Sequence, residues 1–441
     1  MSRGRTLNKI PDAPGRIPGL GHLVSMSRDL PKLLRSMAER DAPIQRLHMP
    51  FSSDIHVWTS SASLSLLSQR DLSAKESAKL GHVVFGHTSM LSSDGADHRR
   101  RRAASQAPFT PKGLSRTGVS DIITEVVTAR CSSMVKRRQV RLLDETQVLS
   151  LEILFRVMGV PSDELDAWAS HYNTMLRGLF SPRWNIPGLP HHRALAARRW
   201  VDDRLGRYVE AARRDPEARG IVAELVRGRD DEGAGLDEIE LFDNLRLLIL
   251  AGHETTASIL AWMVAYLAAL PDLRSRLLDE ARAGEGLPCT AQELRSYPLA
   301  EALFRECLRL HPPITIAHRT ALSPTVVEGF EIPEGTVLGI PLWLLGRAPE
   351  AFEHPERFDP DRWIRRQRKL SPIELSAFGS GPHFCLGFHM ALIEGVQFIL
   401  ALLREMDDAD VRPEMDGLPS ESYLPTSRPR AAETRCRFVS C

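Results

Sequence analysis

The chain of 441 residues has almost no net charge and few cysteines, and each shortage excludes a class of protein. Lysine plus arginine (57) nearly equals aspartate plus glutamate (56), so the formal net charge of +1 argues against a general nucleic-acid binder. None of the six cysteines forms a C-x-x-C pair, so neither a zinc ribbon nor a dithiol redox site is expected. We interpret these thiols as reduced, which is typical of a cytosolic protein.

Several kinds of segment are also missing from the sequence. The polar N-terminus has no apolar run of signal-peptide or membrane-anchor length. There is no long linker, low-complexity segment or internal repeat. With 43% hydrophobic and 26% charged residues, the composition is that of an ordinary soluble protein. We therefore expect a single domain over residues 1–441, in the cytoplasm, without a membrane anchor and as a monomer.

A glycine-rich stretch near the C-terminal end carries the strongest signal. Residues 378–387 read Phe-Gly-Ser-Gly-Pro-His-Phe-Cys-Leu-Gly, and three glycines with a proline exclude a regular helix or strand. The apolar residues 388–400 predict a helix directly afterwards. Cys385 thus lies at a helix start, where free N–H groups should lower a thiol pKa below about 8.5. Such a thiolate suits a soft-ligand iron site; the alternative is a buried structural cysteine.

A long helix is predicted from about Asp237 to Leu270, with Pro271 ending it. Inside its apolar run, residues 251–256 read Ala-Gly-His-Glu-Thr-Thr. A glycine costs about 1 kcal/mol in a helix interior, and a buried carboxylate is costly unless it is paired. A place where local rules fail indicates function. The alternative is a helix kink at which a threonine bonds to the backbone.

Shorter patterns predict the remaining framework. Residues 44–49 and 55–59 are predicted to be strands of a small N-terminal sheet, and residues 326–330 and 336–340 a hairpin around Pro333. His98 and Arg102 are four residues apart on a predicted helix, where they share one face. On its own, this basic run would equally suit a solvated surface.

The motif of Phe378, Gly381, Cys385 and Gly387 resembles the heme-binding signature of the cytochrome P450 superfamily. The resemblance extends from near Pro14 to near Pro425. It implies a mainly α fold with small β-sheets, in which heme b lies between the long central helix and the cysteine loop. It also implies that Cys385 is the axial ligand of the heme iron.

The resemblance further assigns roles to individual residues. The heme propionates would be bound by a basic set: His98, Arg102, Arg319 and His383. Ala251 and Gly252 would leave room for dioxygen, and Glu254 and Thr255 would deliver the protons that oxygen splitting needs. A structural Glu-Arg-Arg network would consist of three residues: Glu306, Arg309 and Arg357.

The implied reaction is hydroxylation or epoxidation of a hydrophobic small molecule, with electrons passed from NAD(P)H by ferredoxin reductase and ferredoxin. The predicted donor face holds basic residues that could also be merely solvated: Arg362, Arg365, Arg366, Arg368 and Lys369. The proline-containing segment 181–190 would form the pocket roof, and the pocket candidates are Leu250, Thr315, Ile316 and Leu424.

A terpenoid-like substrate of secondary metabolism is expected, ahead of a polyketide or fatty acid. One alternative function is a peroxide-driven peroxygenase or a non-oxidative heme-thiolate enzyme, against which the paired Glu254 and Thr255 argue. A more remote alternative is a heme-binding sensor without turnover.

Overall fold

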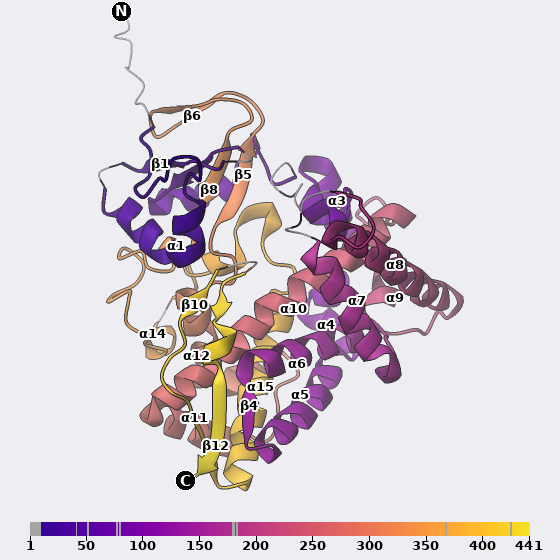
Figure 1. Ribbon diagram of the computed structural model, residues 1–441. Helices are drawn as coiled ribbons and strands as arrows, with labels where there is room; N and C mark the ends of the chain where they lie inside the picture. Colours follow the sequence, from indigo (N-terminus) through magenta and orange to yellow (C-terminus); the bar gives the residue numbers. More distant parts are fainter. Residues whose placement is uncertain are drawn as a thin grey trace, which may run out of the picture.

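Helices make up most of the structure, and small sheets flank them (Figure 1). The computed structural model describes residues 10–40, 42–50, 53–75, 78, 81–178, 181, 184–366, 368–423 and 426–441. The prediction of a mainly α fold with small β-sheets is confirmed. The helices are α1 (Leu23–Ala38), α2 (His82–Phe85), α3 (Gly95–Ser105), α4 (Pro111–Thr117), α5 (Val119–Lys136), α6 (Leu142–Val157), α7 (Leu165–Arg177), α8 (Pro190–Arg214), α9 (Ile221–Arg227), α10 (Glu238–Ala269), α11 (Pro271–Ala283), α12 (Pro298–Leu310), α13 (Leu342–Leu345), α14 (Asp361–Ile364) and α15 (Phe388–Asp408).

The largest sheet has the strand order β1-β2-β8-β5-β3 and lies beside α1 (Figure 1). A second sheet, β4-β12-β9, lies near the C-terminus, and the pairs β6-β7 and β10-β11 form two short hairpins. The strands are β1 (Ile44–Leu47), β2 (Ile55–Trp58), β3 (Leu72–Ser73), β4 (Gln139–Arg141), β5 (Ala317–Ala321), β6 (Thr325–Val327), β7 (Phe330–Ile332), β8 (Val337–Ile340), β9 (Val411–Glu414), β10 (Glu421–Ser422), β11 (Arg428–Pro429) and β12 (Arg435–Ser440).

The two N-terminal strands are confirmed, but the predicted hairpin around Pro333 is wrong. The turn falls earlier, at Glu328 and Gly329, because both residues adopt positive φ angles (47° and 86°) that let β6 fold back on β7. Strand β8 instead joins the large sheet, antiparallel to β5 and parallel to β2. Local turn signals identified the strands but not their partners.

Helix α10 crosses the middle of the molecule and packs against α6 and α15 (Figure 1). It begins with a capping box, in which Asp237 accepts a hydrogen bond from Glu240 N (2.8 Å) and Glu240 accepts one from Asp237 N (3.1 Å). Pro271 starts the next helix, so α10 ends where the sequence predicted. Its 32 residues carry the Ala-Gly-His-Glu-Thr-Thr segment through the largest hydrophobic core.

Two helical segments of the described chain are long and apolar enough to cross a membrane, namely 238–269 and 381–408. In each, 72% of the most apolar window is buried inside the protein. Their apolar surface is therefore covered by neighbouring elements, as in the core helices of a globular protein.

Candidate active site

The cysteine loop is shaped by two glycines. Gly379 and Gly381 have φ angles of +80° and +66°, which side-chain-bearing residues rarely adopt. A Cβ on Gly381 would also approach within 3.0 Å of Ser68 Cα. The loop closes through a hydrogen bond from Cys385 N to Phe378 O at 2.9 Å. The sequence thus places the thiol at a fixed point before α15, because only glycine tolerates this path.

Three phenylalanine rings surround the loop. The Phe378 ring lies 4.7 Å from that of Phe388 and 6.2 Å from that of Phe384, and the latter two are 5.5 Å apart. Burial raises the pKa of Cys385, although the Gly387 N–H and the charge of Arg102 act in the opposite direction. The prediction of a lowered thiol pKa is therefore wrong for the polypeptide alone, because desolvation outweighs the helix start. A bound metal cation would counter this effect by stabilising the thiolate.

Four basic side chains from three distant segments gather beside this loop. His98 of α3 is 2% exposed, and its ring lies 4.1 Å from that of His383. Arg102, one turn further along α3, is close enough to Cys385 for their charges to interact. Arg319 of β5 donates to His318 O at 2.8 Å. The structure therefore brings together the residues predicted to bind the propionates.

This cluster holds more positive than negative groups. Burial, together with the charges of His383 and Arg102, lowers the pKa of His98 to about 3. Asp94 is the carboxylate of the cluster, with Oδ1 3.5 Å from His383 Nε2. Neither Arg102 nor Arg319 forms an ion pair within the described residues. Two partly buried arginines without carboxylates fit the two propionates of heme, since buried cations require anionic partners.

Two small residues of α10 face different neighbours. Ala251 is exposed although most of the helix around it is buried, so its side opens onto free space. Gly252 faces α6 instead, and a Cβ there would lie 2.9 Å from Leu154 Cδ2. The prediction that Gly252 leaves room for dioxygen is therefore wrong: its missing side chain lets α6 approach, and only Ala251 adjoins the open space.

The acid and the alcohol predicted to deliver protons have separate partners. Thr255 Oγ1 donates to Ala251 O at 2.6 Å within its own helix. The carboxylate of Glu254 accepts hydrogen bonds from Gln147 Nε2 at 3.1 and 3.3 Å and from Arg428 Nη1 at 2.9 Å. Sequence reasoning missed Gln147 and Arg428, which lie 107 and 174 residues away and in no recognisable motif.

The predicted Glu-Arg-Arg network exists with a different third member. Glu306 is fully buried and accepts hydrogen bonds from Arg309 Nε and Nη2, both at 2.8 Å. Its next charged partner is Arg362, through Nε at 3.1 Å. The side chain of Arg357 is exposed, and that residue contributes its main-chain carbonyl to Arg309 at 2.9 Å. The assignment of Arg357 is therefore corrected to Arg362.

A signal for this correction was present in the sequence. Residues 355–358 (Pro-Glu-Arg-Phe) and 360–363 (Pro-Asp-Arg-Trp) repeat one pattern, proline, acid, arginine, aromatic. Only the second copy begins a helix, α14, and the indole of Trp363 also donates to Glu306 at 2.9 Å. The turn of α14 directs Arg362 and Trp363 inward together.

The predicted substrate-pocket residues differ in their environments. Thr315 and Ile316 are only 6% and 9% exposed, and Ile316 packs in the small core between α1 and the large sheet. Ile314, on the same segment, is 44% exposed and is the residue that presents its side chain outward. Leu250 of α10 is half-buried. Leu424 lies outside the described residues.

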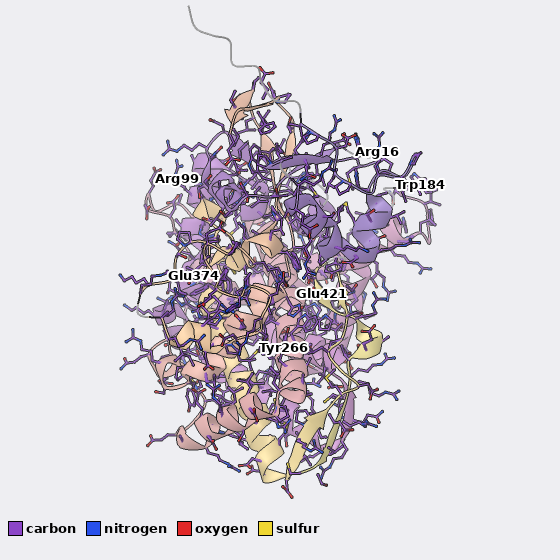
Figure 2. The ribbon with its side chains drawn as sticks, turned by 90° about the vertical axis from the view of Figure 1, so that its left-hand side faces the viewer. Arg16, Arg99, Trp184, Tyr266, Glu374 and Glu421 are labelled. Atoms are coloured by element: carbon purple, nitrogen blue, oxygen red, sulfur yellow. The ribbon has the colours of Figure 1, made fainter. Side chains whose placement is uncertain are left out.

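The predicted roof joins α7 to α8, and its described part is exposed. Trp184 and Ile186 are 63% and 54% exposed, and Figure 2 shows Trp184 at the outer edge of the molecule. The two helices pack through aromatic rings, with Trp168 and Trp200 5.4 Å apart. The helices are thus anchored while the segment between them projects outward.

Several of the basic residues before the cysteine loop form ion pairs within the protein. Arg362 turns inward to Glu306. Arg366 and Arg368 both pair with Glu374, at 2.5 and 2.9 Å. Arg365 pairs with Asp359 at 2.6 Å, although the side chains of Arg365 and Arg368 remain 63% and 60% exposed. Lys369 is also exposed.

Comparison with known proteins identifies this arrangement. Residues 11–409 match the family profile described as Cytochrome P450. The chain is 38% identical over 431 residues to Cytochrome P450 BJ-4 of Bradyrhizobium diazoefficiens, covering 97% of this chain and 96% of that one. It is also 28% identical to Cyclooctat-9-en-7-ol 5-monooxygenase of Streptomyces melanosporofaciens, covering 87% and 86% of the two chains.

The fold resembles that of a solved cyanobacterial protein, described as retinoic acid bound CYP120A1. The TM-score is 0.83 at 21% identity, over 98% of this chain and 100% of that one. A cysteine in a glycine loop, together with a long helix that carries a small residue, an acid and an alcohol, is the pattern of the heme-thiolate class. The chain belongs to the cytochrome P450 family and is a monooxygenase of that family.

Proposed function

We propose that the protein inserts one oxygen atom of dioxygen into a hydrophobic, terpenoid-like small molecule. The observation that carries this is the gathering of His98, Arg102, Arg319 and His383 beside Cys385. These residues fit a heme with Cys385 as its iron ligand. The whole chain would act as one catalytic domain, in the cytoplasm and in secondary metabolism.

The heme, when bound, supplies the iron at which dioxygen is reduced and split. The chain supplies the surroundings of this reaction. Arg102 and Arg319 would neutralise the propionates, and the glycine loop with its three phenylalanine rings would hold the thiolate in place. Ala251 leaves space above the site, and Thr255 offers a hydroxyl beside it. Glu254 carries the protons that reduction of dioxygen consumes.

The substrate class rests on the relative from Streptomyces melanosporofaciens, whose name gives oxidation of cyclooctat-9-en-7-ol. Leu250, which precedes the small Ala251, and the exposed Ile314 are both apolar and suit a similarly apolar substrate. Hydroxylation, epoxidation and multistep oxidation all fit this geometry. Electrons would come from NAD(P)H through a ferredoxin reductase and a ferredoxin, which the exposed Arg365 and Arg368 would attract.

The carbon monoxide difference spectrum of the reduced protein tests the iron ligand. We expect the Soret shift of a thiolate ligand, and its loss in Cys385→His with heme still bound. The matched control is Cys289→Ser, a half-buried cysteine outside the loop, which should leave the spectrum unchanged. An imidazole-type spectrum in fresh wild-type protein would contradict the assignment of Cys385.

A ligand screen tests the substrate class. Terpenoid alcohols and alkenes, polyketide-like lactones and fatty acids would each be titrated against the ferric protein, and displacement of the iron-bound water would be followed spectroscopically. Turnover would then be compared with a ferredoxin system and with hydrogen peroxide. Product from peroxide alone would favour the peroxygenase alternative.

A further inference from the structure

The carboxylate of Glu254 forms its hydrogen bonds on the side that points away from Thr255. Adjacent helix residues point about 100° apart, and the hydroxyl of Thr255 is taken by Ala251 O at 2.6 Å. Both carboxylate oxygens of Glu254 instead accept hydrogen bonds from Gln147 Nε2, and Oε2 also accepts one from Arg428 Nη1. The proton-carrying acid is therefore held by α6 and β11 rather than by its neighbour in sequence.

Arg428 is the end of this arrangement that reaches solvent. Its side chain is 26% exposed, against 10% for that of Glu254. The bond of 2.9 Å between this arginine and the carboxylate is charge-assisted, and such bonds are stronger than those between neutral groups.

The hairpin that carries Arg428 is fastened to α10. Ser258 of α10 donates to Ser427 O at 2.8 Å, and Ser427 N donates to Pro313 O at 2.8 Å. On the partner strand β10, Glu421 lies 3.3 Å from His311, which in turn contacts the hydroxyl of Tyr266 at 2.9 Å. Tyr266 and Glu421 lie close together in Figure 2. Arg428 is thus presented to Glu254 by a fixed support.

The other titratable groups around Glu254 are neutral near pH 7. His253 Nδ1 lies 3.8 Å from Oε1, and burial lowers the pKa of this imidazole. Burial, reinforced by the charge of Glu254, raises the pKa of Tyr172 of α7. Gln147 of α6 does not titrate. Arg428 is therefore the charged partner of Glu254 within the described part of the chain.

We propose that Arg428 is a positioning residue for the oxidation: it holds the carboxylate of Glu254 in place, and so sets the efficiency of proton delivery. The inference rests on the proposed function. Productive turnover combines substrate, dioxygen, two electrons and two protons into hydroxylated product and water. When protons are delivered out of step, the same electrons and protons reduce dioxygen to hydrogen peroxide. Both outcomes take their electrons from NAD(P)H.

The direct test follows the carboxyl group itself by infrared difference spectroscopy of the heme-loaded protein. Glu254→Gln identifies the band of this carboxyl group. In Arg428→Gln we expect the frequency of that band to shift, because the carboxyl loses its charged hydrogen-bond partner. Arg428→Lys should restore most of the wild-type frequency. An unchanged frequency in Arg428→Gln would overturn the proposal.

The second readout is the yield of product per NAD(P)H consumed. We expect Arg428→Gln to lower it, with a matching rise in hydrogen peroxide and little change in the KM for substrate. Arg430→Gln is the matched control, because Arg430 is 53% exposed and pairs only with Glu433. A wild-type yield in Arg428→Gln would also overturn the proposal.

A third variant covers the case in which Arg428→Gln does not fold. Gln147→Leu removes the amide that contacts both oxygens of Glu254 and leaves Arg428 in place, so it should lower the yield by a smaller factor. An unchanged yield in this variant would count against the proposal. If wild-type protein forms no product with any donor, the proposed function fails, whereas the infrared band still decides whether Arg428 controls Glu254.

Discussion

Arg362 Nε lies 3.1 Å from Oε1 of Glu306, and the two residues are 56 positions apart in the chain. This ion pair joins α12 to α14, and α14 precedes the cysteine loop. Glu306 also accepts hydrogen bonds from Asp359 N at 2.7 Å and from the indole N–H of Trp363. The buried carboxylate is therefore the point to which the segment before Cys385 is fastened.

Loss of this carboxylate should prevent heme loading. Glu306→Ala leaves Arg309 buried without its partner, which costs about 3–5 kcal/mol of the free energy of unfolding. We expect poorly folded, heme-free protein, as measured by denaturant unfolding and heme content. Arg362→Ala should show the same effect in milder form, whereas Arg357→Ala should be near neutral. Normally heme-loaded Glu306→Ala protein would refute this role.

Substitution of Gly252 should act through helix packing rather than through the oxygen site. Gly252→Val places atoms against Leu154, whose nearest carbon would lie 2.9 Å from the new Cβ, and overpacking costs about 1–3 kcal/mol. Thermal unfolding would measure this loss, and Leu154→Ala in the same chain should relieve part of it.

The control for Gly252 is Gly206 of α8, where a Cβ would meet only Phe242, at 3.8 Å. Gly206→Ala should stabilise the protein by about 0.5–1 kcal/mol, because alanine is the better helix former. Equal effects at both glycines would contradict the packing explanation.

Glu394 should make stability fall as pH rises. Burial raises the pKa of this carboxyl to about 8, although the hydroxyl of Ser150 donates to it at 2.7 Å. The folded protein therefore holds a proton that the unfolded chain releases above about pH 4.3. Between about pH 5 and 8 the free energy of unfolding should decrease, by up to about 1.4 kcal/mol per pH unit.

The variant Glu394→Gln removes this titration and keeps an acceptor for Ser150. We expect its free energy of unfolding to vary less over pH 5–8, and to exceed that of wild type increasingly toward pH 8. Urea titrations at several pH values measure both. Parallel pH profiles for the two proteins would show that Glu394 does not titrate in this range.

A buried ion network ties α10 to the segment after α2. Asp243 is 3% exposed and pairs with Arg246, while Thr88 donates to it through both N and Oγ1 at 2.8 Å. Asp243→Asn should lower the free energy of unfolding by less than the about 3–5 kcal/mol of a broken buried pair, since Arg246 still pairs with Asp202, whose side chain is 32% exposed. Hydrogen exchange around Thr88 should accelerate. Asp203→Asn, at a position 63% exposed, is the control and should change stability by less than about 0.5 kcal/mol.

Much of the site follows from local sequence patterns. The glycine loop around Cys385, the α10 segment from Ala251 to Thr255 and the pair of Glu306 and Arg309 each lie within a few consecutive residues. Their geometry is set by φ angles and helix periodicity, which act locally. The basic residues His98 and Arg102 were identified in the same way, as one face of α3.

Other features could not be predicted because they depend on contacts between distant elements. The choice of Arg362 over Arg357 required knowing which of two similar turns faces α12. The role of Gly252 depends on Leu154, and the pKa of Cys385 depends on how deeply its loop is buried. Strand β8 pairs with β2 and β5 because of sheet register, not because of the turn beside it.

By itself, the sequence determined the family, the glycine loop that holds Cys385 and the long apolar helix α10, since these are encoded by residue type and short spacing. Only the tertiary structure decided what holds Glu254. Gln147 and Arg428 reach it from α6 and β11, far away along the chain. Hydrogen bonds and ion pairs depend on distance in space, and burial makes them strong. The environment of this acid therefore emerges only when the chain has folded.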